Sequence, residues 1–327
     1  MGHRTTPTVN TVLGPVPAAE LGVVAIHEAL LSVVPGAEHA WDVTIDRAEV
    51  FETLAAKLTE FRTHGGGTLV DRTGMFHGRD LRLYEALSRT TGVHLVASTG
   101  QGPEELLGGY FLTPQTNPPT PWPAGKFAEL FALEAAEGMV VPRVERRGPA
   151  GLVATAATRA GMTATDESLF RGAARAALAT GVPVSVRYGA DVRHDLDVLL
   201  DEGLPADRIA VGDLDLDRDL ARAAAFEVAG RGAYAVLDHL GTEGEGHPTD
   251  AERADLVAEL VAAGHGGRVL LSVGATGVAK GHPGNDLPYA HLLTGFVPLL
   301  RERGLDGTRV RRLLVDNPRE LLTVRAV

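Results

Sequence analysis

Cysteine is absent from the 327-residue sequence, which excludes disulfides, a thiolate nucleophile and cysteine-based zinc or iron–sulfur sites. Lysine is scarce, with three residues at Lys57, Lys126 and Lys280, and no basic run occurs. The net charge is −11 and the pI is near 5.5. Because contacts to nucleic-acid phosphates need clustered lysine and arginine, we expect small molecules or proteins as partners, and no nucleic acid.

Long apolar stretches are also missing. No run of about 18 apolar residues occurs, and the start, MGHRTTPTVNTV, lacks the charged segment and apolar core of a secretory signal. These absences predict a soluble, cytoplasmic protein without a membrane segment. Because α/β barrels often reach this length as one unit, residues 1–327 are predicted to form a single domain.

Short β-branched runs alternate along the chain with segments of helical period, which predicts βαβ units and a parallel sheet. In the first helical segment, Val50, Leu54, Leu58 and Phe61 share one face. Eight strands followed by helices predict a single (β/α)8 TIM barrel. A doubly wound open sheet is the alternative, but no glycine-rich nucleotide-binding turn follows any strand. The predicted strands are residues 23–26, 67–73, 93–99, 151–156, 182–189, 208–217, 234–241 and 268–277.

A long proline-rich loop, residues 100–125, follows the third strand, and its prolines exclude a regular element. Loops of this length in compact domains are often functional. We therefore interpret it as a lid or mouth wall carrying Tyr110, Phe111 and Trp122, with a surface excursion as the alternative. After the eighth strand, residues 277–289 are predicted as a closing loop, followed by two helical stretches.

Reacting groups in such barrels lie at the carboxyl ends of the strands. The residues that follow the apolar runs are therefore the candidates for chemistry. They are His27, Asp71, Ser98, Ala154, Arg187, Asp213, Asp238, His239 and Gly274.

Several motifs, in order and at matching spacing, resemble the phosphotriesterase-like family of the amidohydrolase superfamily over nearly the whole chain. They are VLGPVPAAELG before the first strand, GRD at 78–80, TGVPVSV, RIAVGDLD, YAVLDHLG, VLLSVGA and DNP at 316–318. The resemblance implies a metallohydrolase barrel. It also implies a homodimer.

The resemblance further implies two metals held by six ligands, most of which this sequence lacks. His27 matches the first histidine of the strand-one pair, but the second is Ala29. None of the three lysines lies on strand four, so the bridging carbamate has no source. Residues that only hydrogen-bond to metal ligands cannot replace missing ligands. We therefore do not expect hydrolysis by a binuclear metal centre. The other four ligand positions fall on Ala154, Arg187, Asp213 and Gly274.

Arg187 and Asp213 end adjacent strands at similar height, and we expect them to form an ion pair. One interpretation is that the pair fills a vacated metal pocket. The other is that Arg187 binds a carboxylate, phosphate or oxyanion, while Asp213 and His27 act as general acid and base. His27 alone is more often a hydrogen-bonded structural histidine.

Asp238 and His239 match the family's strand-seven ending, which the resemblance links to substrate contact or proton transfer. His239 is therefore a fourth catalytic candidate beside His27, Arg187 and Asp213. Substrate-binding candidates are Asp238, Tyr188 and Trp122. Asp215 and Asp217 are interpreted as helix caps and Asp71 as a turn residue. His282 and His291 are interpreted as surface residues, with a place at the barrel mouth as the alternative.

Three functions remain open. The first is a metal-independent isomerase, lyase or cyclase acting on a small polar substrate, without a cofactor. The second is a hydrolase of lactones, esters or phosphotriesters with one metal held by His27, Asp213 and His239. The third is a non-catalytic protein that binds a ligand or partner.

Overall fold

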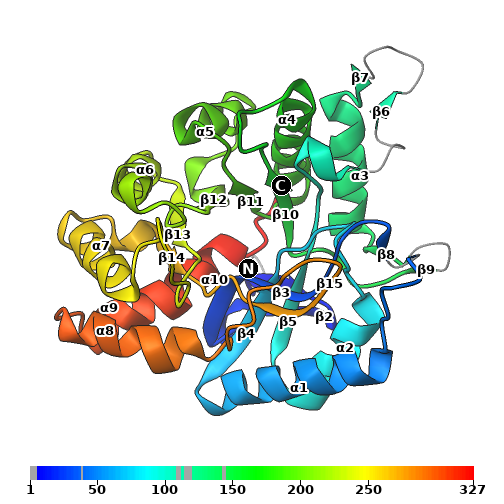
Figure 1. The fold of residues 1–327 in the computed structure, drawn as a ribbon. Coiled ribbons are helices and arrows are strands. Elements are labelled where there is room, and N and C mark those ends of the chain that lie inside the picture. Colours follow the sequence, from blue (N-terminus) through cyan, green and yellow to red (C-terminus); the bar gives the residue numbers. More distant parts are fainter. Residues whose placement is uncertain (1–5, 38–39, 108–111, 114–119, 142–144) are drawn as a thin grey trace, which may run out of the picture.

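Eight parallel strands surrounded by helices form a barrel in the computed structural model (Figure 1). The structure describes residues 6–37, 40–107, 112–113, 120–141 and 145–327. The predicted TIM barrel is confirmed. Its strands are β3 (Val23–Val33), β4 (Gly66–Asp71), β5 (His94–Thr99), β10 (Leu152–Ala156), β11 (Val184–Arg187), β12 (Ile209–Gly212), β13 (Tyr234–Leu237) and β14 (Val269–Leu271).

A further strand, β15 (Thr276–Lys280), lies where the sequence predicted a closing loop. It pairs in parallel with β3, from Thr276 opposite Ala29 to Lys280 opposite Val33. The pairing is possible because β3 continues to Val33 instead of ending at Ile26. The extended end of β3 offers backbone hydrogen-bonding groups beyond the barrel wall, and β15 satisfies them.

The predicted helices form, and polar side chains cap most of their first turns. Asp217 caps α6 by accepting from the backbone of Asp219 and Leu220, as predicted. The apolar face of α1 is buried at the four predicted positions. The helices are α1 (Arg47–Thr63), α2 (Leu81–Thr91), α3 (Ala124–Ala136), α4 (Ala164–Thr180), α5 (Val192–Asp201), α6 (Arg218–Gly230), α7 (Asp250–Ala262), α8 (Val297–Glu302), α9 (Gly307–Arg311) and α10 (Asn317–Leu322).

The lower half of the barrel is filled by apolar side chains, which leaves the other end for chemistry. Val24, Ile26 and Val70 pack there against the other strands, and Leu321 and Leu322 of α10 join the same cluster. The hairpin of β1 (Thr8–Thr11) and β2 (Gly14–Pro17) adds Val9. The described helices include none long and apolar enough to span a bilayer.

The long segment after β5 is described only in part. It contains the short strands β6 (Leu112–Thr113) and β7 (Thr120–Pro121), which pair with each other. Tyr110 and Phe111, predicted to belong to a lid, lie outside the described residues. A second short pair, β8 (Val140–Val141) and β9 (Glu145–Arg146), follows α3.

Candidate functional site

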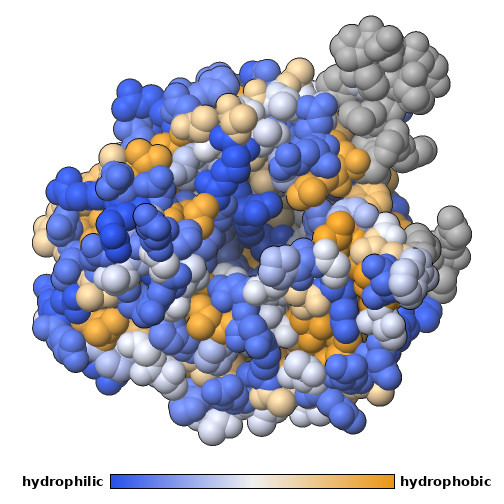
Figure 2. All heavy atoms as spheres, in the orientation of Figure 1, coloured by the Kyte–Doolittle hydropathy of each residue, from blue (hydrophilic) through white to orange (hydrophobic). Residues whose placement is uncertain are grey.

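A cavity of about 470 Å³ opens at the carboxyl ends of the barrel strands. Figure 2 shows a hollow at the centre of this face, with hydrophilic side chains around it. Five of the residues predicted from the strand ends line this cavity. They are His27, Arg187, Asp213, Asp238 and His239.

His27 is buried and both of its ring nitrogens are engaged. Nδ1 lies 2.7 Å from Oδ2 of Asp238 and Nε2 lies 2.6 Å from Oγ of Ser185. Burial, together with the positive charge of Arg72, lowers the pKa of His27. The ring is therefore neutral near pH 7, and these contacts favour a positioning role over the predicted role as acid or base.

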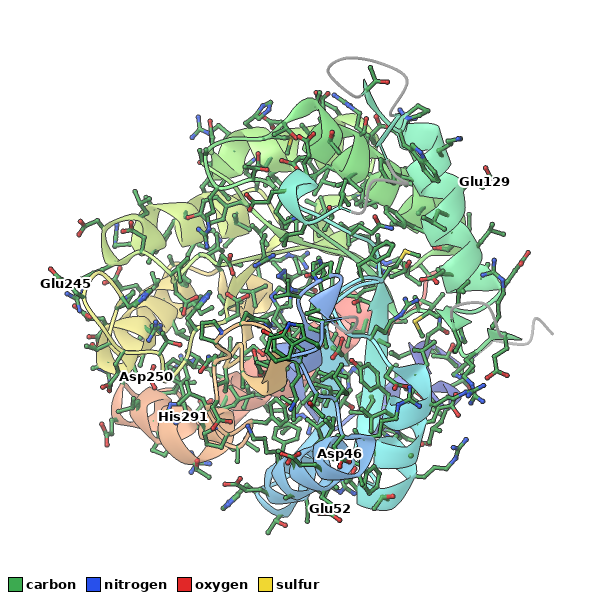
Figure 3. All side chains as sticks on the ribbon, turned by 45° about the vertical axis from the view of Figure 1, so that its right-hand side comes forward. Asp46, Glu52, Glu129, Glu245, Asp250 and His291 are labelled. Atoms are coloured by element: carbon green, nitrogen blue, oxygen red, sulfur yellow. The ribbon has the colours of Figure 1, made fainter. Side chains whose placement is uncertain are left out.

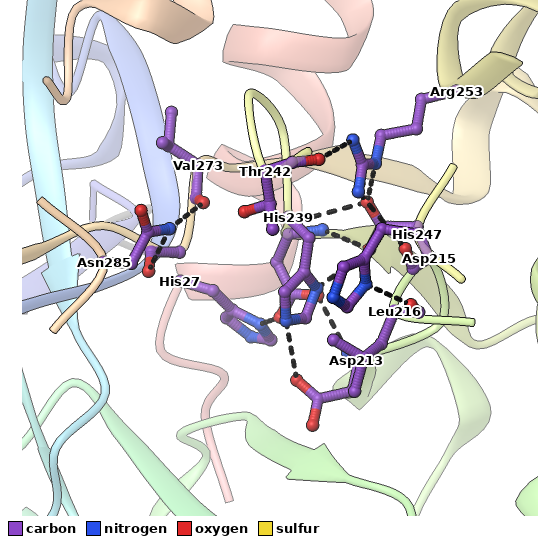
Figure 4. Close-up of polar contacts among 12 residues, drawn as sticks. His27, Asp213, Asp215, Leu216, His239, Thr242, His247, Arg253, Val273 and Asn285 are labelled. Carbon is purple, nitrogen blue, oxygen red and sulfur yellow. Dashed lines mark hydrogen bonds and ion pairs between the residues drawn. The ribbon is translucent and has the colours of Figure 1, made fainter. Parts of the chain in front are cut away.

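Asp215 binds the backbone of Asp238 and His239, the two residues that follow β13 (Figure 4). It is fully buried and accepts hydrogen bonds from the backbone of Asp238 at 2.9 Å and His239 at 3.2 Å. The buried Arg253 of α7 donates to it through Nε at 2.8 Å. The prediction that Asp215 caps a helix was wrong, because its carboxylate turns inward to this arginine.

His239 lies between two carboxylates. Its Nδ1 lies 3.2 Å from Oδ1 of Asp215 and 3.3 Å from Oδ1 of Asp238. Burial disfavours the charged ring, but the hydrogen bonds and charges of both carboxylates outweigh it and raise the pKa of His239 to about 10. Burial likewise disfavours the charge on Asp238, yet hydrogen bonds from His239 and His27 hold the pKa of that carboxyl well below its usual range.

Asp213 faces His239 across the cavity floor, with 3.7 Å between Oδ1 and Nε2. Its φ of 61° is the only positive φ at a non-glycine among the described residues. Such conformations concentrate at functional sites. The backbone is held there by the N–H of Asp213, which donates to Oδ1 of Asp238 at 2.8 Å.

The ion pair predicted between Arg187 and Asp213 is not formed. Oδ2 of Asp213 instead accepts from Nη2 of Arg159 at 2.8 Å. The left-handed backbone turns the carboxylate toward Arg159 and His239, which sequence spacing could not indicate. Arg159 lies in the loop after β10 and was not among the predicted site residues.

Arg187 and Arg72 both line the cavity, and Arg72 was also missed. Nε of Arg187 and Nη1 of Arg72 are buried and have no hydrogen-bond partner among the described residues. Burial and the charge of Arg187 lower the pKa of Arg72 to about 10, so it stays charged. The available signal was its place immediately after Asp71, at the end of strand two.

Glu28 links the first barrel strand, β3, to the residues that follow the last one, β14. Its carboxylate accepts from Oγ of Ser272 at 2.7 Å and from the backbone of Val273 at 3.0 Å and Ala275 at 2.6 Å. The backbone of Ala29 adds a bond to Ala275 at 2.9 Å. Burial raises the pKa of Glu28 to about 7 in spite of the three donors.

Two glycines shape the site. A Cβ at Gly212 would lie 2.5 Å from Oδ2 of Asp238 and 2.8 Å from Nδ1 of His27. Gly274 has φ +64°, and its Cβ would lie 2.2 Å from the backbone oxygen of Asp238. The backbone at Gly274, where the resemblance implies a metal-binding aspartate, therefore leaves no room for one.

Other predicted residues lie elsewhere. Trp122 packs against Phe127 of α3, with ring centroids 5.6 Å apart, and Tyr188 is buried in the core; neither lines the cavity. His282, predicted at the surface, does line it and contacts Ser32 at 2.9 Å. His291 binds Asp250 at 2.7 Å near the start of α7 (Figure 3).

Asp71 is the turn residue that the sequence indicated, and it does more. It accepts from the backbone of Thr73 at 3.1 Å, from that of Leu30 at 2.7 Å and from the hydroxyl of Tyr84 at 3.0 Å. The carboxylate thus ties β3, β4 and α2 together directly below Arg72.

Comparisons with known proteins agree with this architecture. A model of the phosphotriesterase family matches residues 7–322. The phosphotriesterase homology protein of Mycobacterium tuberculosis is 25% identical, covering 96% of this chain and 97% of that protein. The N-acetyltaurine hydrolase of Salmo salar is 24% identical, covering 97% and 98%. A mutant of a Deinococcus radiodurans PTE-like lactonase superposes with a TM-score of 0.85 and 27% identity, covering 96% of this chain and 100% of that one.

Proposed function

We propose that this chain, which belongs to the phosphotriesterase family, is a metal-independent enzyme that moves a proton on a small anionic substrate. The observation that carries the proposal is the arrangement of opposite charges in one cavity. Asp213 lies 3.7 Å from His239, whose pKa is raised to about 10. The guanidinium of Arg187 lines the same cavity, and no carboxylate of the described residues lies within 4.0 Å of it.

The binuclear metal centre of the family does not fit these residues. His27 already uses both ring nitrogens, and Ala29, Ala154 and Gly274 offer no donor side chain. Arg187 places a positive charge where the resemblance implies a ligand. A pair of divalent cations needs several converging anionic or imidazole donors. Here two guanidinium groups, those of Arg72 and Arg187, line the same cavity and would repel a second cation.

The chain's own residues divide the work as follows. Arg187 binds the anionic group of the substrate, for which its planar fork is suited. Asp213 takes a proton from the bound substrate as general base, and His239 donates one or stabilises the negative charge that develops. Asp238, Asp215 and His27 are positioning residues that hold the base and the imidazolium in place. An isomerase, lyase or cyclase reaction suits this set.

The test is a screen of small phosphorylated and carboxylated compounds by proton NMR, using chelator-treated protein. We expect turnover that survives chelation and falls about 10²–10⁴-fold in Asp213→Asn, the usual loss when a general base is removed. Asp217→Asn is the matched control, because an asparagine there still caps α6. Turnover that needs added metal, or that Asp213→Asn leaves unchanged, contradicts the proposal.

A single-metal hydrolase of lactones, esters or phosphotriesters is the second candidate. The observation in its favour is that ligand atoms of Asp213, Asp238 and His239 lie within 4.8 Å of one another. Asp238 thus takes the place that the sequence gave to His27. Stoichiometric zinc, manganese or cobalt in the purified protein, lost in Asp213→Asn, would favour this function over the first. If the first test shows no turnover and the second shows no bound metal, the remaining function is that of a non-catalytic ligand-binding protein.

A further inference from the structure

We propose that Arg72 and Arg187 together bind a doubly charged oxoanion, the class to which phosphate monoesters belong. Arg72 follows the end of β4 and Arg187 ends β11, and both line the same cavity. Each has a buried nitrogen without a hydrogen-bond partner among the described residues, Nη1 in Arg72 and Nε in Arg187. Buried donors of this kind are normally satisfied, so a ligand atom is the missing acceptor.

The carboxylates around the cavity do not neutralise these two charges. Among the described residues, none lies within 4.0 Å of either guanidinium. Asp213 is bound by Arg159, Asp238 by His27, and Glu28 by the end of β14. Each acid is therefore hydrogen-bonded elsewhere. Asp213 and Asp238 still act on Arg72 from a distance, but neither guanidinium has a close carboxylate partner among the described residues.

Two unpaired charges in one cavity indicate a dianion more than a monoanion. Burial is the main cause of the lowered pKa of Arg72, and repulsion by Arg187 is the second; attraction by Asp213 and Asp238 offsets them in part. One ligand with two negative charges relieves this repulsion, and each planar guanidinium can donate two parallel hydrogen bonds to its oxygens. His77, also in the cavity wall, adds no charge because burial and Arg187 lower its pKa to about 4.

The inference rests on the proposed function for the orientation of the ligand. With the oxoanion held by Arg72 and Arg187, the remainder of the molecule reaches Asp213 and His239 on the floor of the same cavity. The substrate is then a small phosphate monoester with a carbon-bound or hydroxyl proton near the phosphate group. The oxoanion serves only for binding, and none of its bonds is broken in the reaction.

The test measures binding, so that it is independent of turnover. Inorganic phosphate, sulfate and acetate are titrated into the intact protein by calorimetry at about pH 8, where phosphate is a dianion. We expect both dianions to bind at least about tenfold more tightly than acetate. Arg72→Gln and Arg187→Gln should each weaken phosphate binding about tenfold or more, since hydrogen bonds to charged groups are strong.

Controls keep the result interpretable. Arg72→Lys retains the charge and loses the fork, so we expect intermediate affinity. Arg222→Gln removes an exposed arginine that pairs with Glu259 on the outer helices, and should leave affinity unchanged. Thermal unfolding of each variant reports whether it folds. Equal affinity for acetate and phosphate, or phosphate binding unchanged in folded Arg72→Gln, overturns the inference.

The two proposals can fail separately. Phosphate binding that depends on both arginines, with no turnover of any compound, refutes only the proposed function. Turnover that depends on Asp213, with phosphate binding indifferent to Arg72, refutes only the two-arginine site.

Discussion

His27 and Asp238 are joined by a 2.7 Å contact between Nδ1 and Oδ2, although β14 lies between the strands that carry them. The contact crosses the space above Gly212, whose missing side chain leaves room for both groups. This buried pair links the start of the barrel to the strand-seven ending. The geometry of the cavity floor depends on it.

Gly212→Ala should therefore destabilise the fold, although it adds only one methyl group at the cavity floor. The added Cβ meets both members of the pair, and overpacking of this kind costs about 1–3 kcal/mol of unfolding free energy. Urea unfolding measures the loss. Gly230→Ala, at the end of α6 with open space around it, is the control and should be neutral or slightly stabilising. Equal effects at both positions would contradict this account.

Restoring the family's aspartate at position 274 should fail. Gly274→Asp requires a left-handed backbone, and its Cβ would meet the backbone oxygen of Asp238. We expect a loss of a few kcal/mol and no gain in bound zinc. Gly304→Asp separates the cost of the left-handed backbone from the cost of the clash, because Gly304 has φ +79° and a Cβ there would meet nothing within 4 Å. This variant should lose only about 1–2 kcal/mol of unfolding free energy. Zinc bound stoichiometrically by a stable Gly274→Asp would refute the prediction.

Removing Arg253 should strongly destabilise the fold. Arg253→Met removes the guanidinium that binds Oδ2 of the buried Asp215, and breaking a buried ion pair costs about 3–5 kcal/mol. Arg222→Met, on the exposed pair with Glu259, should cost about 0–1 kcal/mol. Chemical denaturation compares the two variants. Similar losses would mean that the buried contact contributes no more than a surface pair.

His239 should make stability depend on pH on the alkaline side. Its pKa is about 10 in the folded protein and about 6.5 in the unfolded chain. Its contribution is therefore complete below about pH 6.5, decreases above it, and is lost as the pH rises through about 10.

The corresponding measurement compares unfolding free energy across this range in the wild type and in His239→Gln. The difference between the two should shrink as pH rises, while His64→Gln, at an exposed residue, should follow the wild type. A difference that stays constant with pH would show that His239 does not hold its proton.

Local pattern predicted the barrel well, because each buried strand is a short β-branched run. The exception is β15, which contains Gly277 and Lys280 and forms only because β3 extends beyond the barrel to pair with it. That extension is a tertiary effect. A strand that depends on a distant partner carries little signal in its own residues.

Site residues that directly follow a strand could be predicted from the sequence. Residues that reach the site from a helix or a distant loop could not. Arg253 reaches Asp215 from α7, and Arg159 reaches Asp213 from a loop. No local spacing encodes either contact. Arg72, by contrast, could have been found, since a charged residue directly after a buried strand end faces the mouth of the barrel.

Glu28 shows how this architecture separates closure from reactivity. It lies between the two positions that the family resemblance assigns to metal binding, His27 and Ala29, yet its carboxylate points to β14 and joins the last strand to the first. Closure at this point therefore needs neither neighbour as a metal ligand. A side chain at position 29 can thus change the chemistry at the mouth while the wall of the barrel stays closed.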